Sequence, residues 1–99
     1  KDVIKPGGLQ VWPGDVEKVI GTHPDVEEVG VAGVPDPYYG EAVKAWVVLK
    51  HGRCCRQEEI INWCRNRLAP YKIPAYIDFI EKLPRSTVGK ILRRELKKL

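Results

Sequence analysis

Hydrophobic residues recur at helical spacing in two segments of the chain. Pro13, which suits the first turn of a helix, is followed by Val16, Val19, Ile20 and His23 at i, i+3, i+4 and i+7. These four side chains make one face of a short helix, which we predict to end by the next proline.

A second helix is predicted over residues 56–68. Its apolar face is formed by Ile60, Cys64 and Leu68, which are spaced four residues apart. Acidic residues lie near its start and arginines near its end, as the helix dipole prefers, and Pro70 terminates it.

Three segments have the pattern of β-strands. Residues 26–34 are rich in valine with small residues between, residues 42–50 are apolar mainly in their second half, and residues 76–81 alternate. A loop at residues 36–40, which contains Pro and Gly, separates the first two strands.

Two further elements lie at the ends of the chain. Pro6-Gly7-Gly8 is a turn signal within residues 2–12, which predicts an N-terminal β-hairpin or sharp loop. Residues 90–99 are predicted to form a closing helix with leucines on one face. The predicted fold class is therefore α+β: a small sheet of about three strands with helices packed on it, plus the N-terminal β-hairpin.

The positive charge of the chain is concentrated at its C-terminal end. Residues 85–99 hold six of the seventeen Lys and Arg residues and one of the thirteen acids, so the net charge of +4 comes from this segment. The 99 residues make one small domain, with no apolar run of the roughly 18–20 residues that a membrane span needs. The chain lacks methionine and opens on Lys1, and we expect it to be part of a larger protein.

Lys90 is the main candidate for chemistry in this basic segment. It follows Gly89 where a loop is predicted to become the closing helix, and glycine lets the backbone project the next side chain outward. A lysine there can neutralise a phosphate or carboxylate held by another domain. A solvated surface lysine is the alternative, and the pattern taken alone favours it.

The turn around Gly7 and Gly8 is a candidate ligand loop. A backbone without a Cβ can approach a narrow ligand closely, and Lys5 and Gln10 lie beside it in sequence. A tight hairpin turn is the simpler interpretation of the same residues.

Tyr39 and Tyr71 are candidates for stacking on a purine. Both lie in loops that contain proline, where an aromatic face can be exposed to a ligand. Half-buried tyrosines that close a small core are the more common case.

The cysteines and histidines do not form a metal-binding pattern. Cys54 and Cys55 are adjacent, Cys64 lies on a predicted apolar face, and no CxxC spacing is present. His23 has no His or Cys near it in sequence. We predict no metal site and, since no disulfide framework is indicated, a reducing cytoplasmic setting.

Nucleic-acid binding is an alternative suggested by the basic closing helix. No RNA- or DNA-binding signature is present, and residues 1–84 are slightly acidic. We interpret the other cations of the helix as surface charges: Arg93, Arg94, Lys97 and Lys98. No nucleic-acid partner is expected, and a stand-alone basic binding module for nucleic acid or an acidic partner stays as the alternative.

Three long stretches resemble one enzyme family in order. They are KDVIKPGGLQVWPGDVE, HPDVEEVGVAGVPDPYYGEAVKAWVVL and LAPYKIPAYIDFIEKLPRSTVGKILRREL. The chain is similar to the small C-terminal domain of the adenylate-forming enzymes: acyl- and aryl-CoA synthetases, nonribosomal peptide adenylation domains and firefly luciferase. KPGGLQVWP and PDPYYGEAVKAW most resemble bacterial medium- or long-chain fatty acyl-CoA synthetases.

The resemblance implies a catalytic role for Lys90. It matches the family's lysine in a Pro-x4-Gly-Lys motif, which contacts the acyl carboxylate and the α-phosphate of ATP as the acyl-adenylate forms. Lys1 and Asp2 match the hinge to the large N-terminal domain. Rotation there is implied to move Lys90 out and bring the loop 5–10 in, so residues 1–99 are expected to be one mobile C-terminal domain.

The resemblance also implies contacts with CoA. Gly8 matches a position beside the pantetheine tunnel, with Lys5, Gly7 and Gln10 around it. Tyr39 and Tyr71 match aromatic positions that contact the CoA nucleotide in some members.

The chain departs from the family at Ile73 and Ala75. Some members carry Arg or Lys there, which bind the CoA phosphates. The contacts with the CoA phosphates are therefore expected to differ, and Lys72 or a basic residue of the N-terminal domain is expected to substitute for the missing cations.

The implied activity is that of a fatty acid–CoA ligase, which forms acyl-AMP from ATP, with Mg²⁺, and then a thioester with CoA. The implied partner is the chain's own N-terminal domain, which would bind most of the ATP, CoA and fatty acid, so this domain is expected to be inactive alone. Transfer to a carrier protein is the alternative within the family. The expected location is cytoplasmic, with a peripheral position at the membrane left open.

Overall fold

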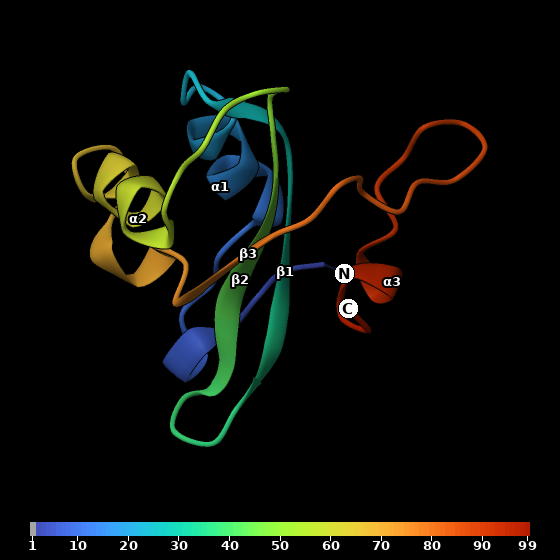
Figure 1. Cartoon of the computed structure of the whole chain (residues 1–99). Helices are drawn as coiled ribbons and strands as arrows, with labels where there is room; N and C mark the ends of the chain where they lie inside the picture. Colours follow the sequence, from blue (N-terminus) through green and yellow to red (C-terminus); the bar gives the residue numbers. More distant parts are fainter. Residues whose placement is uncertain (1) are drawn as a thin grey trace.

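The structure, a computed structural model, describes residues 2–99 and contains three helices, three strands and two 3-10 turns. In chain order they are η1 (Pro6–Gly8), α1 (Pro13–Ile20), β1 (Val26–Asp36), β2 (Gly40–Leu49), α2 (Gln57–Arg65), η2 (Pro70–Lys72), β3 (Tyr76–Phe79) and α3 (Arg93–Leu96). The sheet has the order β1-β2-β3, with β1 antiparallel and β3 parallel to β2 (Figure 1). The predicted α+β class with three strands is confirmed.

A tight turn joins β1 to β2. The Asp36 carboxylate accepts hydrogen bonds from the backbone N–H groups of Tyr38 and Tyr39, at 3.1 and 2.8 Å. Gly40 completes the turn with φ +81°, a conformation that residues with a Cβ rarely adopt. The turn thereby fixes the position of Tyr39.

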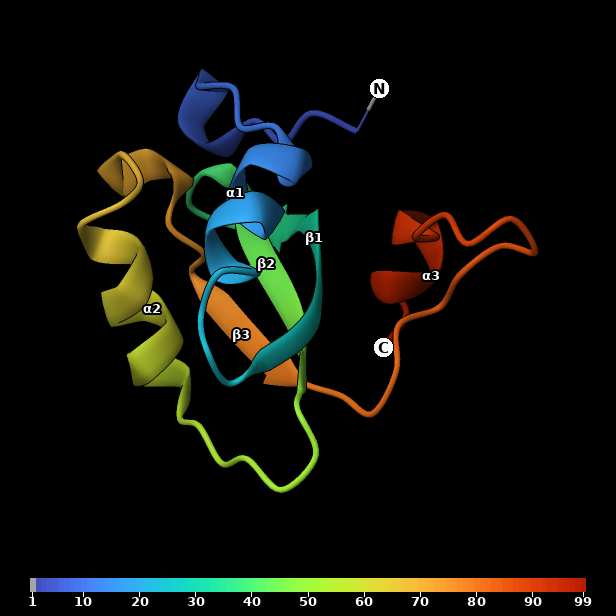
Figure 2. The ribbon, with the colours of Figure 1, turned by 90° about the horizontal axis from the view of Figure 1, so that it is seen from above.

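The two faces of the sheet are covered by different parts of the chain. Alternate residues of β1 and β2 point to opposite faces, as expected for extended strands. On one face α1 and α2 enclose what we call the main core, and on the other α3 covers a smaller group (Figure 2). The main core consists of Ile4, Val11, Val16, Ile20, Val26, Val29, Val31, Val43, Ala45, Val47, Ile60, Cys64 and Ile77. The small cluster consists of Ala32, Trp46, Leu83 and Leu96.

The predicted N-terminal hairpin is reduced to a single bonded pair. Ile4 and Val11 exchange two backbone hydrogen bonds, at 2.8 and 2.7 Å, and both side chains are fully buried in the main core. The turn between them is η1, in which Gly7 and Gly8 have φ of +58° and +86°. The two glycines are therefore needed by the backbone of this turn.

The closing helix is shorter than predicted, and the expectation that Lys90 begins it was wrong. The helix α3 covers only Arg93–Leu96. Residues 85–91 form a small turn that we call the Lys90 hairpin, because Arg85 and Ile91 pair across it. Its backbone bonds join Ser86 N–H to the Lys90 carbonyl at 2.8 Å and Gly89 N–H to the Ser86 carbonyl at 2.9 Å. Gly89, at φ +88°, allows the reversal that prevents a helix from starting here.

None of the helices in residues 2–99 combines the length and the apolar character required to span a bilayer.

Candidate functional site

The Lys90 hairpin extends away from the sheet (Figures 1 and 2). Lys90 and its neighbours Thr87 to Gly89 are exposed, and the hairpin extends beyond α3 on that side of the molecule (Figures 1 and 2). The Lys90 backbone N–H donates to the Ser86 hydroxyl oxygen at 3.2 Å. Its ammonium has no hydrogen bond or ion pair within residues 2–99, so it is available to a group outside this chain.

The base of the hairpin is held by Arg85. One guanidinium nitrogen donates to the Gly89 carbonyl at 2.6 Å, and another lies 3.6 Å from the Glu28 carboxylate on β1. An arginine that binds both a turn carbonyl and a strand carboxylate restricts the orientation of the hairpin.

A second arginine, Arg93, is not the surface charge that the sequence suggested. Its guanidinium donates to both oxygens of Glu17 at 2.9 and 2.8 Å and to the Val31 carbonyl at 2.9 Å. Glu17 also accepts from the Val31 backbone N–H at 2.9 Å. Only 19% of the Arg93 side chain and 16% of the Glu17 side chain are exposed. We call this closed ring of contacts the Arg93 network.

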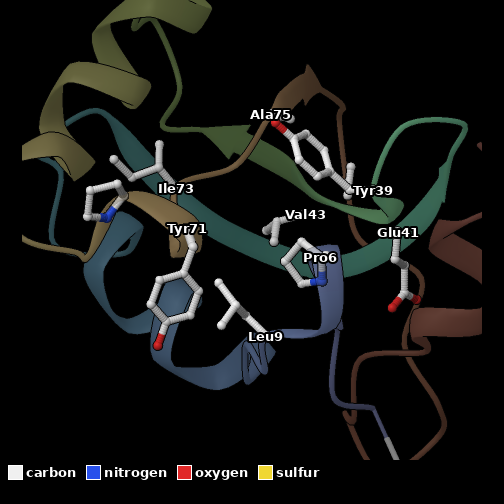
Figure 3. A pocket seen from close by; sticks show the side chains of 11 residues that line it. Pro6, Leu9, Tyr39, Glu41, Val43, Tyr71, Ile73 and Ala75 are labelled. Carbon is white, nitrogen blue, oxygen red and sulfur yellow. The ribbon is translucent and has the colours of Figure 1, made fainter.

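An apolar pocket of about 510 Å³ lies on the other side of the sheet, next to η1 (Figure 3). Three separate segments supply its walls, and most of the exposed wall surface is apolar. The lining residues are Pro6, Gly7, Leu9, Tyr39, Glu41, Ala42, Val43, Pro70, Tyr71, Ile73 and Ala75. A cavity of this size and character is typical of a small-molecule site.

The pocket brings together three of the predicted ligand residues. Gly7, Tyr39 and Tyr71 all line it, although they come from distant parts of the sequence. The Gly7 N–H donates to the Tyr39 carbonyl at 3.0 Å, and a Cβ at Gly7 would lie 3.6 Å from the Tyr39 ring. The glycine turn and the aromatic ring therefore form one continuous wall.

The other predicted ligand residues lie around the pocket rather than in its lining. Gly8 faces open space, and Gln10 is exposed at the end of the same loop. Lys5 is exposed as well, although its backbone N–H donates to the Glu41 carboxylate at 2.8 Å. The Lys72 ammonium lies 5.8 Å from the centre of the Tyr71 ring, which places a cation beside the aromatic wall.

Several pocket residues were missed from the sequence. Ile73 and Ala75 were noted only as departures from the family, yet both line the cavity. Leu9 is half exposed beside the glycine turn. The sequence signal that could have indicated its role is an apolar residue directly after the two turn glycines. Glu41 reaches the site only through the β1–β2 pairing, which a local pattern does not reveal.

A separate cluster of potential metal ligands was also missed. Side-chain atoms of His23, Asp25 and Cys55 lie within 4.8 Å of one another. Each has a protein partner: Asp25 N–H donates to His23 Nδ1 at 3.1 Å, and Arg53 pairs with the Asp25 carboxylate. Burial, with nearby Glu59 and Asp25, raises the pKa of the Cys55 thiol to about 12. These contacts account for the cluster without an ion.

Known proteins with sequences similar to this chain include CoA ligases. The chain is 50% identical over 96 residues to the long-chain-fatty-acid–CoA ligase of Bacillus subtilis (strain 168), covering 97% of the chain and 17% of the ligase. It is 48% identical over 98 residues to the 2-succinylbenzoate–CoA ligase of Geobacillus kaustophilus (strain HTA426), covering 99% and 20%. The chain thus spans about a fifth of the length of these relatives.

Solved structures give the same result for the fold. A fatty acyl CoA synthetase of Mycobacterium tuberculosis superposes with a TM-score of 0.92 at 40% identity, over 98% of this chain and 19% of that one. An o-succinylbenzoate CoA synthetase of Bacillus subtilis, with an Ile→Arg and an Ala→Lys substitution two positions apart and a bound product analogue, gives 0.93 at 37% identity, over 99% and 20%.

The family match itself covers most of the chain and includes Lys90 as its last residue. Residues 15–90 match the family described as the AMP-binding enzyme C-terminal domain. Together with the identities above, this match establishes that the chain belongs to the family of AMP-binding enzyme C-terminal domains.

Proposed function

We propose that this chain is the mobile C-terminal domain of a fatty acid–CoA ligase. The observation that carries the proposal is the presence of two distinct candidate sites on one small domain. The exposed Lys90 hairpin lies on the α3 side of the sheet, and η1 lies on the other (Figures 1 and 2). Pro6 and Gly7 of η1 line the pocket. Two sites on opposite sides fit a domain that presents one and then the other to a common cleft.

In the first half-reaction, Lys90 is proposed to act on the reacting anions. A carboxylate oxygen of the fatty acid attacks the α-phosphorus of ATP, the bond from that phosphorus to the β-phosphate oxygen breaks, and pyrophosphate leaves. Two anionic groups must approach each other, so a fixed ammonium nearby lowers the barrier. The unpaired Lys90 ammonium is suited to this role, since no group of residues 2–99 competes for it.

In the second half-reaction, the pocket side is proposed to receive CoA. The CoA sulfur attacks the acyl carbonyl carbon, the thioester bond forms, and AMP leaves. The backbone at Gly7 and Gly8 presents no Cβ to the narrow pantetheine chain, and Tyr39 and Tyr71 offer aromatic surfaces to the nucleotide. Lys72, beside Tyr71, is the nearby cation proposed for a CoA phosphate.

The change between the two states is proposed to occur at the N-terminal end. Lys1 lies outside the described residues, and Asp2 is exposed and 3.7 Å from the Arg93 guanidinium. Backbone rotation at this point would turn the domain as a unit, because the sheet holds its two sides together.

The proposal is tested by Lys90→Ala in the full-length enzyme that contains this chain. Acyl-adenylate formation should fall roughly 100- to 1,000-fold, as when one transition-state donor is removed. Thioester formation from pre-made acyl-adenylate should be retained. Lys82→Ala, which removes an exposed lysine just before the hairpin, is the matched control. Unchanged adenylation in Lys90→Ala would contradict the proposal.

A carrier protein instead of CoA is a second candidate acceptor, because Ile73 and Ala75 of the pocket offer no cation to the CoA phosphates. A fatty acyl enzyme that uses free CoA should gain affinity from new cations there. The double substitution Ile73→Arg with Ala75→Lys should then lower the KM for CoA by up to about tenfold, or ~1.4 kcal/mol. If the KM for CoA does not change, and the enzyme transfers the acyl group faster to a carrier protein than to free CoA, the second candidate is supported.

A stand-alone nucleic-acid module receives less support from the structure than from the sequence. The basic helix is a single turn, and Arg93 is bound within the Arg93 network rather than exposed. Salt-sensitive binding of the chain to an oligonucleotide would reopen this alternative.

A further inference from the structure

The Arg93 network joins the C-terminal segment to two elements far away in sequence. Arg93 and Glu17 are 76 residues apart, yet the guanidinium binds both carboxylate oxygens, and both residues also bond to the backbone of Val31. The network therefore ties the first residue of α3 to α1 and to the centre of β1.

This connection matters because α3 cannot hold its own position. A helix of one turn, Arg93–Leu96, is not stable without tertiary contacts. Its apolar contacts come from Leu96, which with Leu83 and Ile91 packs over Gly30 on β1. Such packing is non-directional, so it keeps the segment on the sheet but sets its orientation weakly.

The contacts of Arg93 set the orientation of the α3 segment on the sheet. Nη2 of the guanidinium donates to both oxygens of Glu17, and Nε donates to the Val31 carbonyl. Two nitrogens of one planar group are thereby held by two different partners, which fixes the orientation of the guanidinium.

Lys90 is three residues before Arg93. Of the two residues between them, Ile91 pairs with Arg85 across the hairpin, and the Leu92 N–H donates to the Pro84 carbonyl at 2.9 Å. A displacement of Arg93 is therefore transmitted to Lys90.

We propose that Arg93 is a positioning residue for Lys90, acting through the Arg93 network. The inference rests on the proposed function, since it assigns Arg93 a role only in the half-reaction that uses Lys90. The same guanidinium is 3.7 Å from Asp2, the expected hinge residue, so the network also links the hairpin to the N-terminal end.

The test uses full-length enzyme with Arg93→Gln and Arg93→Lys, and Arg94→Gln as the matched control. Arg94 is the adjacent, exposed arginine of the same helix and lies outside the network. We expect the kcat of adenylation to fall roughly 10- to 100-fold in both Arg93 variants, because a small misplacement of a catalytic group is costly. The KM for ATP, the thioester half-reaction and the control should be unchanged. Arg93→Lys should not restore adenylation, since an ammonium lacks the planar guanidinium that donates to Glu17 and Val31 together.

A double variant distinguishes positioning from general structural support. If Arg93 acts through Lys90, then Lys90→Ala with Arg93→Gln should lose no more adenylation than Lys90→Ala alone. If the thermal melt shows that Arg93→Gln does not fold, the same measurements can be made on Glu17→Gln. This variant removes the charge that Arg93 binds and keeps the size of the side chain.

Two results would overturn the inference: unchanged adenylation in folded variants, or equal losses in both half-reactions. These outcomes differ from failure of the proposed function, in which Lys90→Ala itself would retain adenylation.

Discussion

The pocket beside Gly7 and the Lys90 hairpin are held in place by different forces. The pocket side is apolar and continuous with the main core, since Val43 belongs to the main core and also lines the pocket. The hairpin is polar and exposed, and its orientation depends on ion pairs made by Arg85 and Arg93 on top of the small cluster.

The difference corresponds to what each side is proposed to do. A wall that selects a ligand by shape needs fixed packing, which the main core supplies. A lysine that enters and leaves a cleft must stay solvated when it is outside, and a hairpin anchored only at its base allows this. One domain can therefore present a rigid pocket wall on one side and an exposed lysine ammonium on the other without changing its own fold.

The largest expected effect comes from opening the main core with Ile60→Ala. This fully buried side chain of α2 packs in the main core, and such truncations cost about 2–5 kcal/mol of unfolding free energy. Chemical denaturation of the chain should show the loss as a global one, with the pocket side and the hairpin side unfolding together. A cost below about 1 kcal/mol would contradict the assignment of this face as the main core.

A smaller and more local effect is expected from Gly30→Ala. A Cβ there would lie 2.8 Å from Leu96 Cδ1 and 3.2 Å from Leu83 Cδ2, so the C-terminal segment must move. Overpacking of this kind costs about 1–3 kcal/mol. Hydrogen exchange should show lost protection in α3 and the Lys90 hairpin but not in α2. Gly14→Ala, where a Cβ meets nothing within 4 Å, is the control and should leave protection unchanged.

A still smaller effect is expected from Arg85→Gln at the base of the hairpin. Its ion pair with Glu28 is partly exposed, with 38% and 39% of the two side chains accessible. Pairs of this kind contribute about 0–1 kcal/mol and weaken with salt. Nuclear relaxation of the hairpin amides should report greater motion in the variant, and in the wild type at high salt. Equal motion in both at all salt concentrations would show that the apolar contacts alone hold the hairpin.

The smallest perturbation is chemical labelling of the three cysteines. Cys54 is exposed, whereas burial raises the pKa of Cys55 to about 12 and that of Cys64 to about 11. Since the thiolate is the reactive form, a raised pKa leaves these two thiols protonated at pH 8. Iodoacetamide should label Cys54 first, with Cys55 gaining reactivity only as the pH approaches 12. Rapid labelling of Cys64 at pH 8 would indicate that the main core opens.

Local sequence patterns predicted the elements because each depends on near neighbours. The apolar faces containing Val16 and Ile60, the valine-rich β1 and the glycine turn at Gly7 all follow from spacing along the chain. The pattern failed at Lys90, where Gly89 and the pairing of residues 85 and 91 replace the first turn of the expected helix.

Contacts between distant segments could not be predicted in the same way. The ion pair of Arg93 with Glu17 and the bond from Lys5 to Glu41 depend on strand register and on which face each helix covers. Arginine in a basic run is usually solvated, so only the fold shows that Arg93 is an internal group. The candidate role of Lys90 likewise came from the order of segments in the family and not from its charge alone.

Opposite sides of this domain are proposed to serve different half-reactions. Measuring both half-reactions in two variants of the full-length enzyme tests this division of roles most directly. Lys90→Ala removes the charge of the hairpin, and Gly7→Val forces a branched side chain onto a backbone with φ +58° next to Tyr39. We expect opposite losses: Lys90→Ala should lose adenylation and keep thioester formation, and Gly7→Val should lose thioester formation and keep adenylation. Loss of the same half-reaction in both folded variants would contradict it.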